Sequence, residues 1–187
     1  MADLEAARQA LLEELREHAL IIGEVTLSSG ATAQYYVDAR RALLRPRGFR
    51  AAGQLVAAAA AAAGADAVGG PATAAIPVAC AAIGVEEGSG LRAFFARKER
   101  KQHGLQREVE GPVEEGDRVL VVEDTVTTGG STVEALGQVK AAGLEVAGVV
   151  AVVDRLAGGG EAIESAARAP YRALVTIDEL YPDRPDA

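Results

Sequence analysis

Two long, continuous apolar runs constrain the fold of this chain more than any other feature. RVLVV begins at position 118 and EVAGVVAVV begins at position 145, and neither run alternates apolar with polar residues. A strand without such alternation is covered on both of its faces, as happens in parallel sheets. Segments of helical periodicity separate the apolar runs along the chain, which is typical of α/β proteins. The pattern predicts an α/β fold with an open, mainly parallel sheet flanked by helices.

Apolar periodicity and turn residues locate the individual elements. We expect an amphipathic helix over residues 3–20, short strands around a Ser-Ser-Gly turn over 25–40, and a helix over 47–64 that Gly64 ends. Strands are expected at 66–70, 91–97, 118–124, 145–155 and 171–177, helices at 71–85, 132–142 and 160–169, and a long polar loop at 99–111. A chain of 187 residues suits a single domain, here with a small N-terminal hood over about 1–45 and a core over about 46–187.

Composition excludes several classes of protein. The net charge of −8 argues against nucleic acid as a partner, so any local cluster of cations is informative. Two of the three lysines, Lys98 and Lys101, lie in one such cluster, ARKERKQHG. The longest apolar stretch is shorter than the roughly 20 residues of a membrane span, and the acidic N-terminus does not resemble a signal peptide. A single cysteine, Cys80, is expected to be buried in an apolar run, and together these features predict a cytoplasmic protein.

The stretch VLVVEDTVTTGGST carries the clearest chemical signal. It places Glu123 and Asp124 at the carboxyl end of a buried strand, which is where open parallel sheets bind ligands. The loop that follows offers hydroxyl groups, backbone N–H groups beside glycines and a helix N-terminus, and all three suit a phosphate. The two carboxylates are suited to accept hydrogen bonds from the vicinal hydroxyls of a ribose. The stretch therefore predicts a site for a phosphorylated sugar, with an ordinary capped turn between strand and helix as the alternative.

VLVVEDTVTTGGST resembles the 5-phosphoribosyl 1-diphosphate binding motif of the type I phosphoribosyltransferases. Three further segments resemble the orotate phosphoribosyltransferases within that family. LSSGATAQYYVDAR is similar to their N-terminal signature, ARKERKQHG to their mobile catalytic loop, and VVDR to their strand that ends in Asp-Arg. The resemblance implies the type I phosphoribosyltransferase fold. It also implies a Mg²⁺-dependent transfer of the phosphoribosyl group to orotate in pyrimidine biosynthesis, which yields orotidine 5′-monophosphate and pyrophosphate.

The same resemblance implies roles for the matching residues. Glu123 and Asp124 would hold the ribose hydroxyls, directly or through water bound to Mg²⁺. The 5-phosphate would lie in a loop formed by Thr125, Val126, Thr127, Thr128, Gly129, Gly130 and Ser131, with Thr127 also near the base. The pyrophosphate would meet Arg97, Lys98, Lys101 and His103. Orotate would contact Arg155, whose planar guanidinium suits its polar edge, and the strand that carries Tyr35 and Tyr36. The catalytic residues would be Lys101, His103 and Asp124, with Lys101 and His103 competing as proton donor to the leaving oxygen.

The family resemblance further implies a homodimer in which the catalytic loop of one subunit reaches the active site of its neighbour. Two positions depart from the family's pattern. Some members have a lysine where this chain has Ser28, and some have another in the loop that here reads GGPATAAIP, at Thr73 and Ala74. Backbone N–H groups of residues 72–74, or the side chains of Arg41 or Arg45, would then have to bind the pyrophosphate.

Structural interpretations remain open for several of these residues. ARKERKQHG taken alone also suits a solvated surface run, and His18 suits the surface or a dimer contact. Tyr35 and Tyr36 point to opposite sides of a strand, so one of them is expected to pack in the core. Two neighbouring pairs of opposite charge suit simple ion pairs: Asp154 with Arg155, and Asp38 with Arg40.

Two other functions fit the phosphate motif. A purine phosphoribosyltransferase shares it, but a neutral purine needs neither the YYVD segment nor Arg155. A regulator that senses the diphosphate and binds nucleic acid is disfavoured by the net charge of −8 and by the lysines of the catalytic loop. Transfer to orotate is therefore the leading hypothesis.

Overall fold

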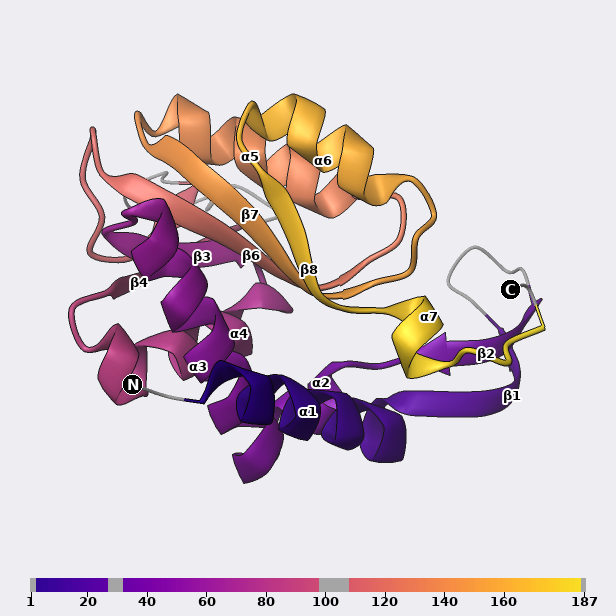
Figure 1. Ribbon diagram of the computed structural model, residues 1–187. Coiled ribbons are helices and arrows are strands. Elements are labelled where there is room, and N and C mark those ends of the chain that lie inside the picture. Colours follow the sequence, from indigo (N-terminus) through magenta and orange to yellow (C-terminus); the bar gives the residue numbers. More distant parts are fainter. Residues whose placement is uncertain (1–2, 27–31, 98–107, 186–187) are drawn as a thin grey trace.

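The computed structural model describes residues 3–26, 32–97 and 108–185, which form a six-stranded sheet with helices on both faces and a smaller N-terminal layer (Figure 1). The strand order is β5-β4-β3-β6-β7-β8, and every neighbouring pair is parallel except β4 and β5. This arrangement confirms the predicted α/β fold. The strands are β3 (Ala67–Pro71), β4 (Arg92–Ala96), β5 (Val109–Glu110), β6 (Arg118–Val126), β7 (Glu145–Asp154) and β8 (Tyr171–Thr176).

Two pairs of helices cover the sheet. The helices α3 (Pro46–Ala63) and α4 (Ala75–Ile83) pack on one face, and α5 (Gly130–Ala141) and α6 (Gly159–Ala167) pack on the other (Figure 1). Successive residues of β6 alternate between these two layers, as strand geometry requires. Leu120 and Val122 join the core under α3 and α4, whereas Val119 and Val121 join the core under α5. Both faces of the apolar strands are therefore buried, which explains their unbroken hydrophobic runs.

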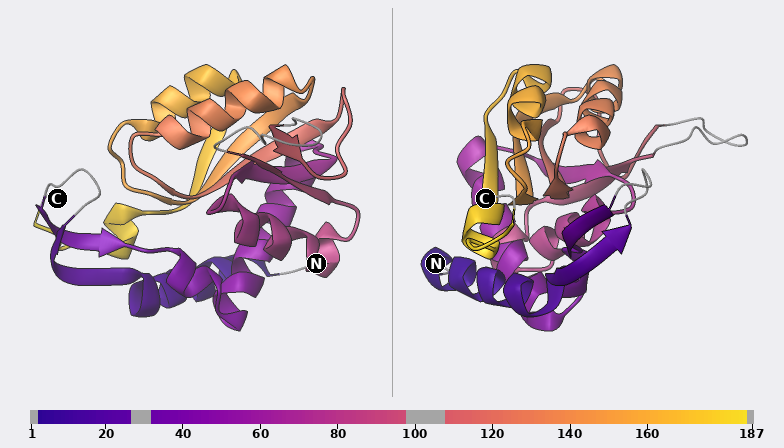
Figure 2. Two further views of the ribbon diagram at one scale, coloured as in Figure 1. Left: turned by 180° about the vertical axis from the view of Figure 1, so that it is seen from behind. Right: turned by 90° about the vertical axis from the view of Figure 1, so that its right-hand side faces the viewer.

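The N-terminal layer forms a hood beside this sheet. It contains α1 (Leu4–Glu14), a π-helical turn (Leu15–Ala19), the antiparallel hairpin of β1 (Leu20–Thr26) and β2 (Thr32–Val37), and α2 (Arg40–Leu43). The hairpin projects from one end of the molecule in both Figure 1 and Figure 2. The short C-terminal helix α7 (Ile177–Leu180) fastens the sheet to the hood, because Glu179 pairs with Arg8 of α1.

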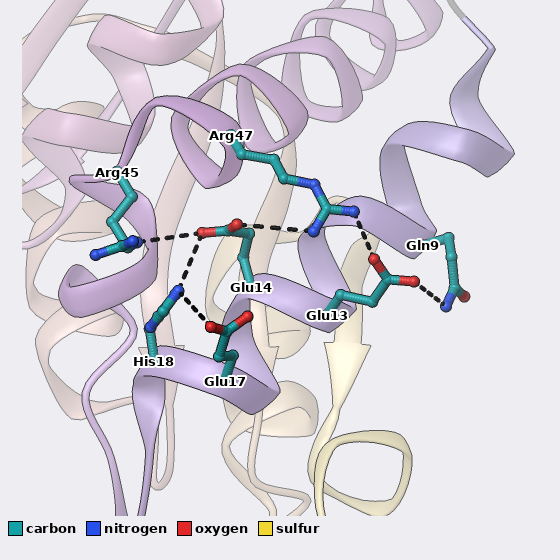
Figure 3. Close-up of polar contacts among 7 residues, drawn as sticks. All are labelled: Gln9, Glu13, Glu14, Glu17, His18, Arg45 and Arg47. Carbon is teal, nitrogen blue, oxygen red and sulfur yellow. Dashed lines mark hydrogen bonds and ion pairs between the residues drawn. The ribbon is translucent and has the colours of Figure 1, made fainter.

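A buried carboxylate anchors α1 to the start of α3. Glu14 is almost fully buried, and Figure 3 shows it directed toward Arg45, Arg47 and His18. Its carboxylate oxygens lie 3.6 Å from Arg45 Nε, 3.7 Å from Arg47 Nη1 and 3.9 Å from His18 Nε2. His18 also lies 3.6 Å from Glu17, so this histidine belongs to the anchor of the hood. Several long ion pairs thus offset the cost of burying one acid.

The structure corrects the predicted start of the fourth helix and the burial of the cysteine. Pro71 is the last residue of β3, opposite Ala96, and α4 begins only at Ala75. The fixed φ of proline suits a strand end as well as a helix start, and the three residues after Pro71 make the turn that separates strand from helix. Cys80 is exposed, because the apolar helix α4 packs on its neighbours with only part of its circumference.

Several short elements and strand extensions were not predicted. These are α2, a 3₁₀ turn at Glu86–Gly88, α7 with its capping box between Thr176 and Glu179, the start of β1 at Leu20, and the continuation of β6 past the acidic pair to Val126. The two residues of β5 also form a strand within the predicted polar loop. Among the helices of the described residues, none combines the length and apolarity needed to cross a membrane.

Candidate active site

The candidate site lies where the strand order reverses. The chain runs from β3 outward to β4 on one side, whereas β6, β7 and β8 extend the sheet on the other side of β3. In such sheets the loops at the carboxyl ends of the two central strands part and leave a crevice for a ligand. The turn after Pro71 and the loop after Val126 both start at this edge. The stretch VLVVEDTVTTGGST therefore ends at the crevice between β3 and β6, where the strand order reverses.

The two adjacent acids of the motif lie on opposite faces of β6. Glu123 follows Val119 and Val121 in the alternation and is only 3% exposed. Its Oε2 accepts hydrogen bonds from Ser131 Oγ at 3.1 Å and Thr132 Oγ1 at 2.9 Å, both at the start of α5. Asp124 lies on the other face of β6, the side of Leu120 and Val122, and is only partly buried. The structure thus separates a buried carboxylate that holds the loop in place from a second, less deeply buried one on the opposite face of the strand.

Burial has different consequences for the two acids. Burial, followed by the charge of Asp124, raises the pKa of Glu123 to about 7, against the lowering effect of its hydrogen bonds from Thr132 and Ser131. Burial also raises the pKa of Asp124, but the backbone N–H of Thr125, which donates at 2.6 Å, and the nearby charge of Arg40 lower it. Asp124 is therefore the member of the pair better equipped to carry a negative charge at neutral pH.

The loop between β6 and α5 is shaped for an anion. Gly129 adopts a left-handed conformation with φ of +79°, and its carbonyl accepts the N–H of Val133 at 2.9 Å. The carbonyl of Thr127 accepts the N–H of Gly159 at 3.1 Å, which ties the loop to the start of α6. The helix α5 then begins at Gly130, so its N-terminal N–H groups and positive dipole end face this loop. Thr125 adds a buried hydroxyl oxygen that has no hydrogen-bond partner among the described residues.

A second polar group comes from β7 and the hood. Arg155, which follows the last residue of β7, places its guanidinium carbon 5.3 Å from the ring centroid of Tyr35. Tyr35 is buried and meets Tyr181 edge to face at 5.5 Å, whereas Tyr36 is only partly buried, so the predicted division of the two tyrosines is confirmed. The buried Nε of Arg155 has no hydrogen-bond partner within the described ranges. The structure therefore brings Tyr35 and Arg155 together and leaves the buried Nε donor of Arg155 without a partner among the described residues.

Other predicted residues are only partly placed. Lys98, Lys101, His103 and Ser28 lie outside the described residues. Arg97 follows the end of β4, at the same edge of the sheet as the end of β6, and lies 3.8 Å from Glu110 in an ion pair.

Some of the groups expected to bind pyrophosphate in place of the family's lysines already have partners within the protein. Ala72 donates its N–H to the carbonyl of Ala96 at 2.7 Å, and Arg45 pairs with Glu14. The predicted pair of Asp38 and Arg40 is confirmed at 2.7 Å, and the charge of Arg40 acts on Asp124. Sequence reasoning thus missed Arg40 as a cation beside the acidic motif.

The alternative interpretation of Asp154 and Arg155 as a simple ion pair does not hold among the described residues, because Asp154 makes other contacts. Asp154 accepts hydrogen bonds from the backbone N–H of Leu156 at 2.7 Å and from the phenol of Tyr171 at 2.9 Å. The order of β7 and β8 in the sheet creates the contact with Tyr171, so sequence spacing carries no signal for it.

A cavity of about 830 Å³ elsewhere in the molecule is less suited to this chemistry. It is lined by residues of the β5–β6 connection and the end of α5, including Val109, Pro112 and Leu144. Its polar lining includes Glu108, Glu114 and Glu115, whose negative charges would repel a phosphorylated substrate.

The described residues contain no group of three or more histidine, cysteine or acidic side chains placed to hold a metal. A cation at the site would have to take further ligands from a bound molecule or from water.

Comparisons with known proteins agree with this geometry. Residues 46–170 match the model of the phosphoribosyl transferase domain. The orotate phosphoribosyltransferase of Corynebacterium glutamicum is 49% identical over 174 residues, covering 93% of this chain and 94% of the relative. A crystal structure of the Mycobacterium tuberculosis orotate phosphoribosyltransferase with Fe(III) dicitrate is 43% identical with a TM-score of 0.84, covering 94% of this chain and 99% of that chain.

A second structure of the M. tuberculosis enzyme is in complex with 5-phospho-α-D-ribosyl 1-diphosphate. It is 40% identical with a TM-score of 0.80, and the match covers 93% of this chain and 98% of that chain. These relatives cover 93–94% of the chain, so the similarity includes most of the hood as well as the core that the domain model matches. The chain therefore belongs to the orotate phosphoribosyltransferases of the type I phosphoribosyltransferase family.

Proposed function

We propose that this protein transfers the phosphoribosyl group of 5-phosphoribosyl 1-diphosphate to orotate, giving orotidine 5′-monophosphate and pyrophosphate in pyrimidine biosynthesis. The observation that carries the proposal is the pairing of an anion-binding loop, backed by the N-terminus of α5, with a partly exposed acid, Asp124, on the adjoining strand. A phosphorylated ribose satisfies both. The bound diphosphate in the M. tuberculosis relative supports this reading.

In this proposal the two acids have different tasks. Asp124 accepts hydrogen bonds from the ribose hydroxyls and favours the positive charge that develops on the sugar as the bond to pyrophosphate breaks. Glu123 holds Ser131 and Thr132, and through them the start of α5, in the position that the 5-phosphate needs. The residues from Thr125 to Ser131 wrap that phosphate. This refines the sequence-based hypothesis that both acids reach the ribose.

The base is bound at the other side of the site. Arg155 offers a planar set of N–H donors to the carboxylate or ring oxygens of orotate, and the buried ring of Tyr35 supports its guanidinium. Tyr36 and Thr127 are expected nearby. Orotate is an anion and binds hydrogen-bond donors. The buried Nε of Arg155, which has no partner among the described residues, can supply one.

We propose that Mg²⁺ is bound jointly by oxygen atoms of the protein and of the substrate. Mg²⁺ prefers oxygen ligands, keeps several waters and binds through one or two carboxylates plus phosphates. Asp124 would supply the protein's share, directly or through bound water, because Glu123 lies on the opposite face of β6 and holds Ser131 and Thr132. When bound, the ion neutralises charge on the diphosphate. We propose that Arg97, Lys98, Lys101 and His103 stabilise the pyrophosphate as it leaves, with Lys101 or His103 as the proton donor.

We further propose a homodimer in which Lys101 and His103 act in the partner's site. Mixing Lys101→Ala chains with Asp124→Asn chains tests this point, because each mixed dimer then contains one site with both native groups. Recovery of activity, relative to either variant alone, is expected. Mixtures that stay as inactive as the separate variants would contradict action across the interface.

We also propose that the chain forms a single domain, with the hood over 1–45 and the core over 46–187, and that the protein is located in the cytoplasm.

A direct assay tests the function. The decrease in orotate absorbance is followed with and without 5-phosphoribosyl 1-diphosphate and Mg²⁺, and adenine, hypoxanthine and guanine are offered as rival bases. We expect turnover of orotate only when both the diphosphate and Mg²⁺ are present. Turnover of a purine without turnover of orotate would favour the purine enzyme instead. Binding of the diphosphate without release of pyrophosphate would favour the sensing regulator.

A further inference from the structure

We propose that Asp154 and Tyr171 form a positioning pair that fixes Arg155 in the orientation required to bind orotate. The proposal rests on the proposed role of Arg155 as an orotate ligand and adds two residues that do not themselves touch the substrate. It explains why an acid that directly precedes Arg155 makes its hydrogen bonds elsewhere.

The first observation is how the backbone around Arg155 is held. The N–H of Arg155 donates to the carbonyl of Val126 in β6 at 2.9 Å. One residue further on, the N–H of Leu156 donates to Asp154 Oδ1 at 2.7 Å. The Cα of Arg155 therefore lies between two fixed hydrogen bonds, one to the strand that carries the acidic motif and one to Asp154.

The second observation is the conformation of Leu156. Its φ is +56°, in the left-handed region that a leucine normally avoids, and the residue is 50% exposed, so tight packing does not account for this conformation. The hydrogen bond from its N–H to Asp154 is the contact that compensates. The chain turns sharply immediately after Arg155 because Asp154 holds this conformation.

The third observation is how Asp154 itself is held. Asp154 is 95% buried, and its Oδ2 accepts a hydrogen bond from the phenol of Tyr171, the first residue of β8, at 2.9 Å. Burial and this hydrogen bond raise the pKa of Tyr171, so its phenol stays a donor throughout the physiological range. Each oxygen of Asp154 thus has one assigned donor.

The fourth observation is a glycine that makes room for the pair. A Cβ added to Gly160 would lie 2.6 Å from Cε1 of Tyr171 and 3.2 Å from Oδ2 of Asp154. No side chain fits there without displacing the tyrosine ring. Helix α6 therefore packs on the pair through a residue that leaves the phenol and the carboxylate in contact.

Arg155 has few other constraints on its orientation. Its guanidinium stacks on Tyr35, and its buried Nε makes no hydrogen bond to a described residue. A small rotation of the backbone at Arg155 would therefore move the guanidinium relative to Tyr35. Loss of the positioning pair should weaken orotate binding much more than binding of the diphosphate, because the hydrogen bonds of the pair hold the residues around Arg155 and none of them reaches the loop between β6 and α5.

Tyr171→Phe tests the proposal, because it removes one hydroxyl and retains the ring. We expect the KM for orotate to rise about tenfold, with the KM for the diphosphate within twofold of the wild-type value. Tyr181→Phe is the matched control, since it removes a tyrosine hydroxyl and keeps the ring that packs on Tyr35. Gly160→Ala should reproduce the effect of Tyr171→Phe, and Gly137→Ala, at a glycine with open space around it, should not.

A crystal structure of Tyr171→Phe provides a readout that needs no turnover. We expect the guanidinium of Arg155 to leave its position 5.3 Å from the Tyr35 ring centroid. Unchanged KM values together with an unmoved Arg155 would overturn the proposal, as would equal rises in both KM values. Absence of orotate turnover in the wild-type protein would instead refute the proposed function, and the displacement of Arg155 would still decide the positioning role.

Discussion

Replacing Glu123 by glutamine is expected to stabilise the protein at neutral and alkaline pH. The carboxyl is 3% exposed, and burial raises its pKa to about 7, whereas in the unfolded chain it ionises near 4.5. A carboxyl with a raised folded-state pKa binds its proton more tightly in the folded protein. Its contribution to stability is therefore fully present below pH 4.5 and is lost as the pH rises to about 7.

The size of the effect follows from the same two pKa values. Their separation corresponds to about 3 kcal/mol of folding free energy lost by the wild-type protein across this range. Glutamine cannot ionise, and its carbonyl oxygen still accepts the hydroxyls of Ser131 and Thr132. The free energy of unfolding of the variant should therefore be higher than that of the wild type by less than about 1 kcal/mol at pH 5 and by about 3 kcal/mol at pH 8.

Urea denaturation of both proteins at pH 5, 6, 7 and 8 measures this difference. Comparing the two proteins at each pH removes the contribution of every other titrating group. Glu87→Gln is the control, because it makes the same substitution at an exposed position. Parallel stability profiles for wild type and Glu123→Gln would refute the reasoning, since they would mean that Glu123 titrates alike in the folded and unfolded states.

Three further predictions concern packing and the phosphate loop. In Gly159→Ala, the new Cβ would lie 2.5 Å from the carbonyl oxygen of Thr127, so calorimetry should show at least tenfold weaker binding of 5-phosphoribosyl 1-diphosphate; unchanged affinity would contradict the loop geometry. Gly137→Ala lies on α5 with nothing near the added Cβ, so thermal unfolding should show stabilisation of up to about 1 kcal/mol, and a lower Tm would contradict this. Glu14→Ala removes the acid between Arg45 and Arg47, so urea unfolding should show a loss of about 1 to 2 kcal/mol, and an unchanged midpoint would show that the anchor contributes nothing.

Much of the core was predictable because its signals are local. The apolar runs of β6 and β7 are unbroken since both faces are buried, and Gly64 ends α3 in a left-handed conformation, as its place after a helical pattern predicts. The phosphate loop was predictable for the same reason. Its strand, acids, glycines and helix start are contiguous in the sequence.

Other features depend on contacts between distant segments and could not be predicted. Sequence places Glu123 and Asp124 side by side, but only the fold assigns them different tasks, because it brings the start of α5 to Glu123 and the charge of Arg40 to Asp124. The contact of Tyr171 with Asp154 arises because β8 pairs with β7. Pro71 was misassigned since proline suits both a strand end and a helix start.

A crystal structure of the protein with orotate, 5-phosphoribosyl 1-diphosphate and Mg²⁺ bound would test the central claim most directly. We predict the 5-phosphate in the loop from Thr125 to Ser131, the ribose hydroxyls at Asp124, and the orotate carboxylate or ring oxygens within hydrogen-bond distance of Arg155. Glu123 should still accept the hydroxyl of Thr132. A ribose bound away from Asp124, or orotate bound away from Arg155, would contradict the account.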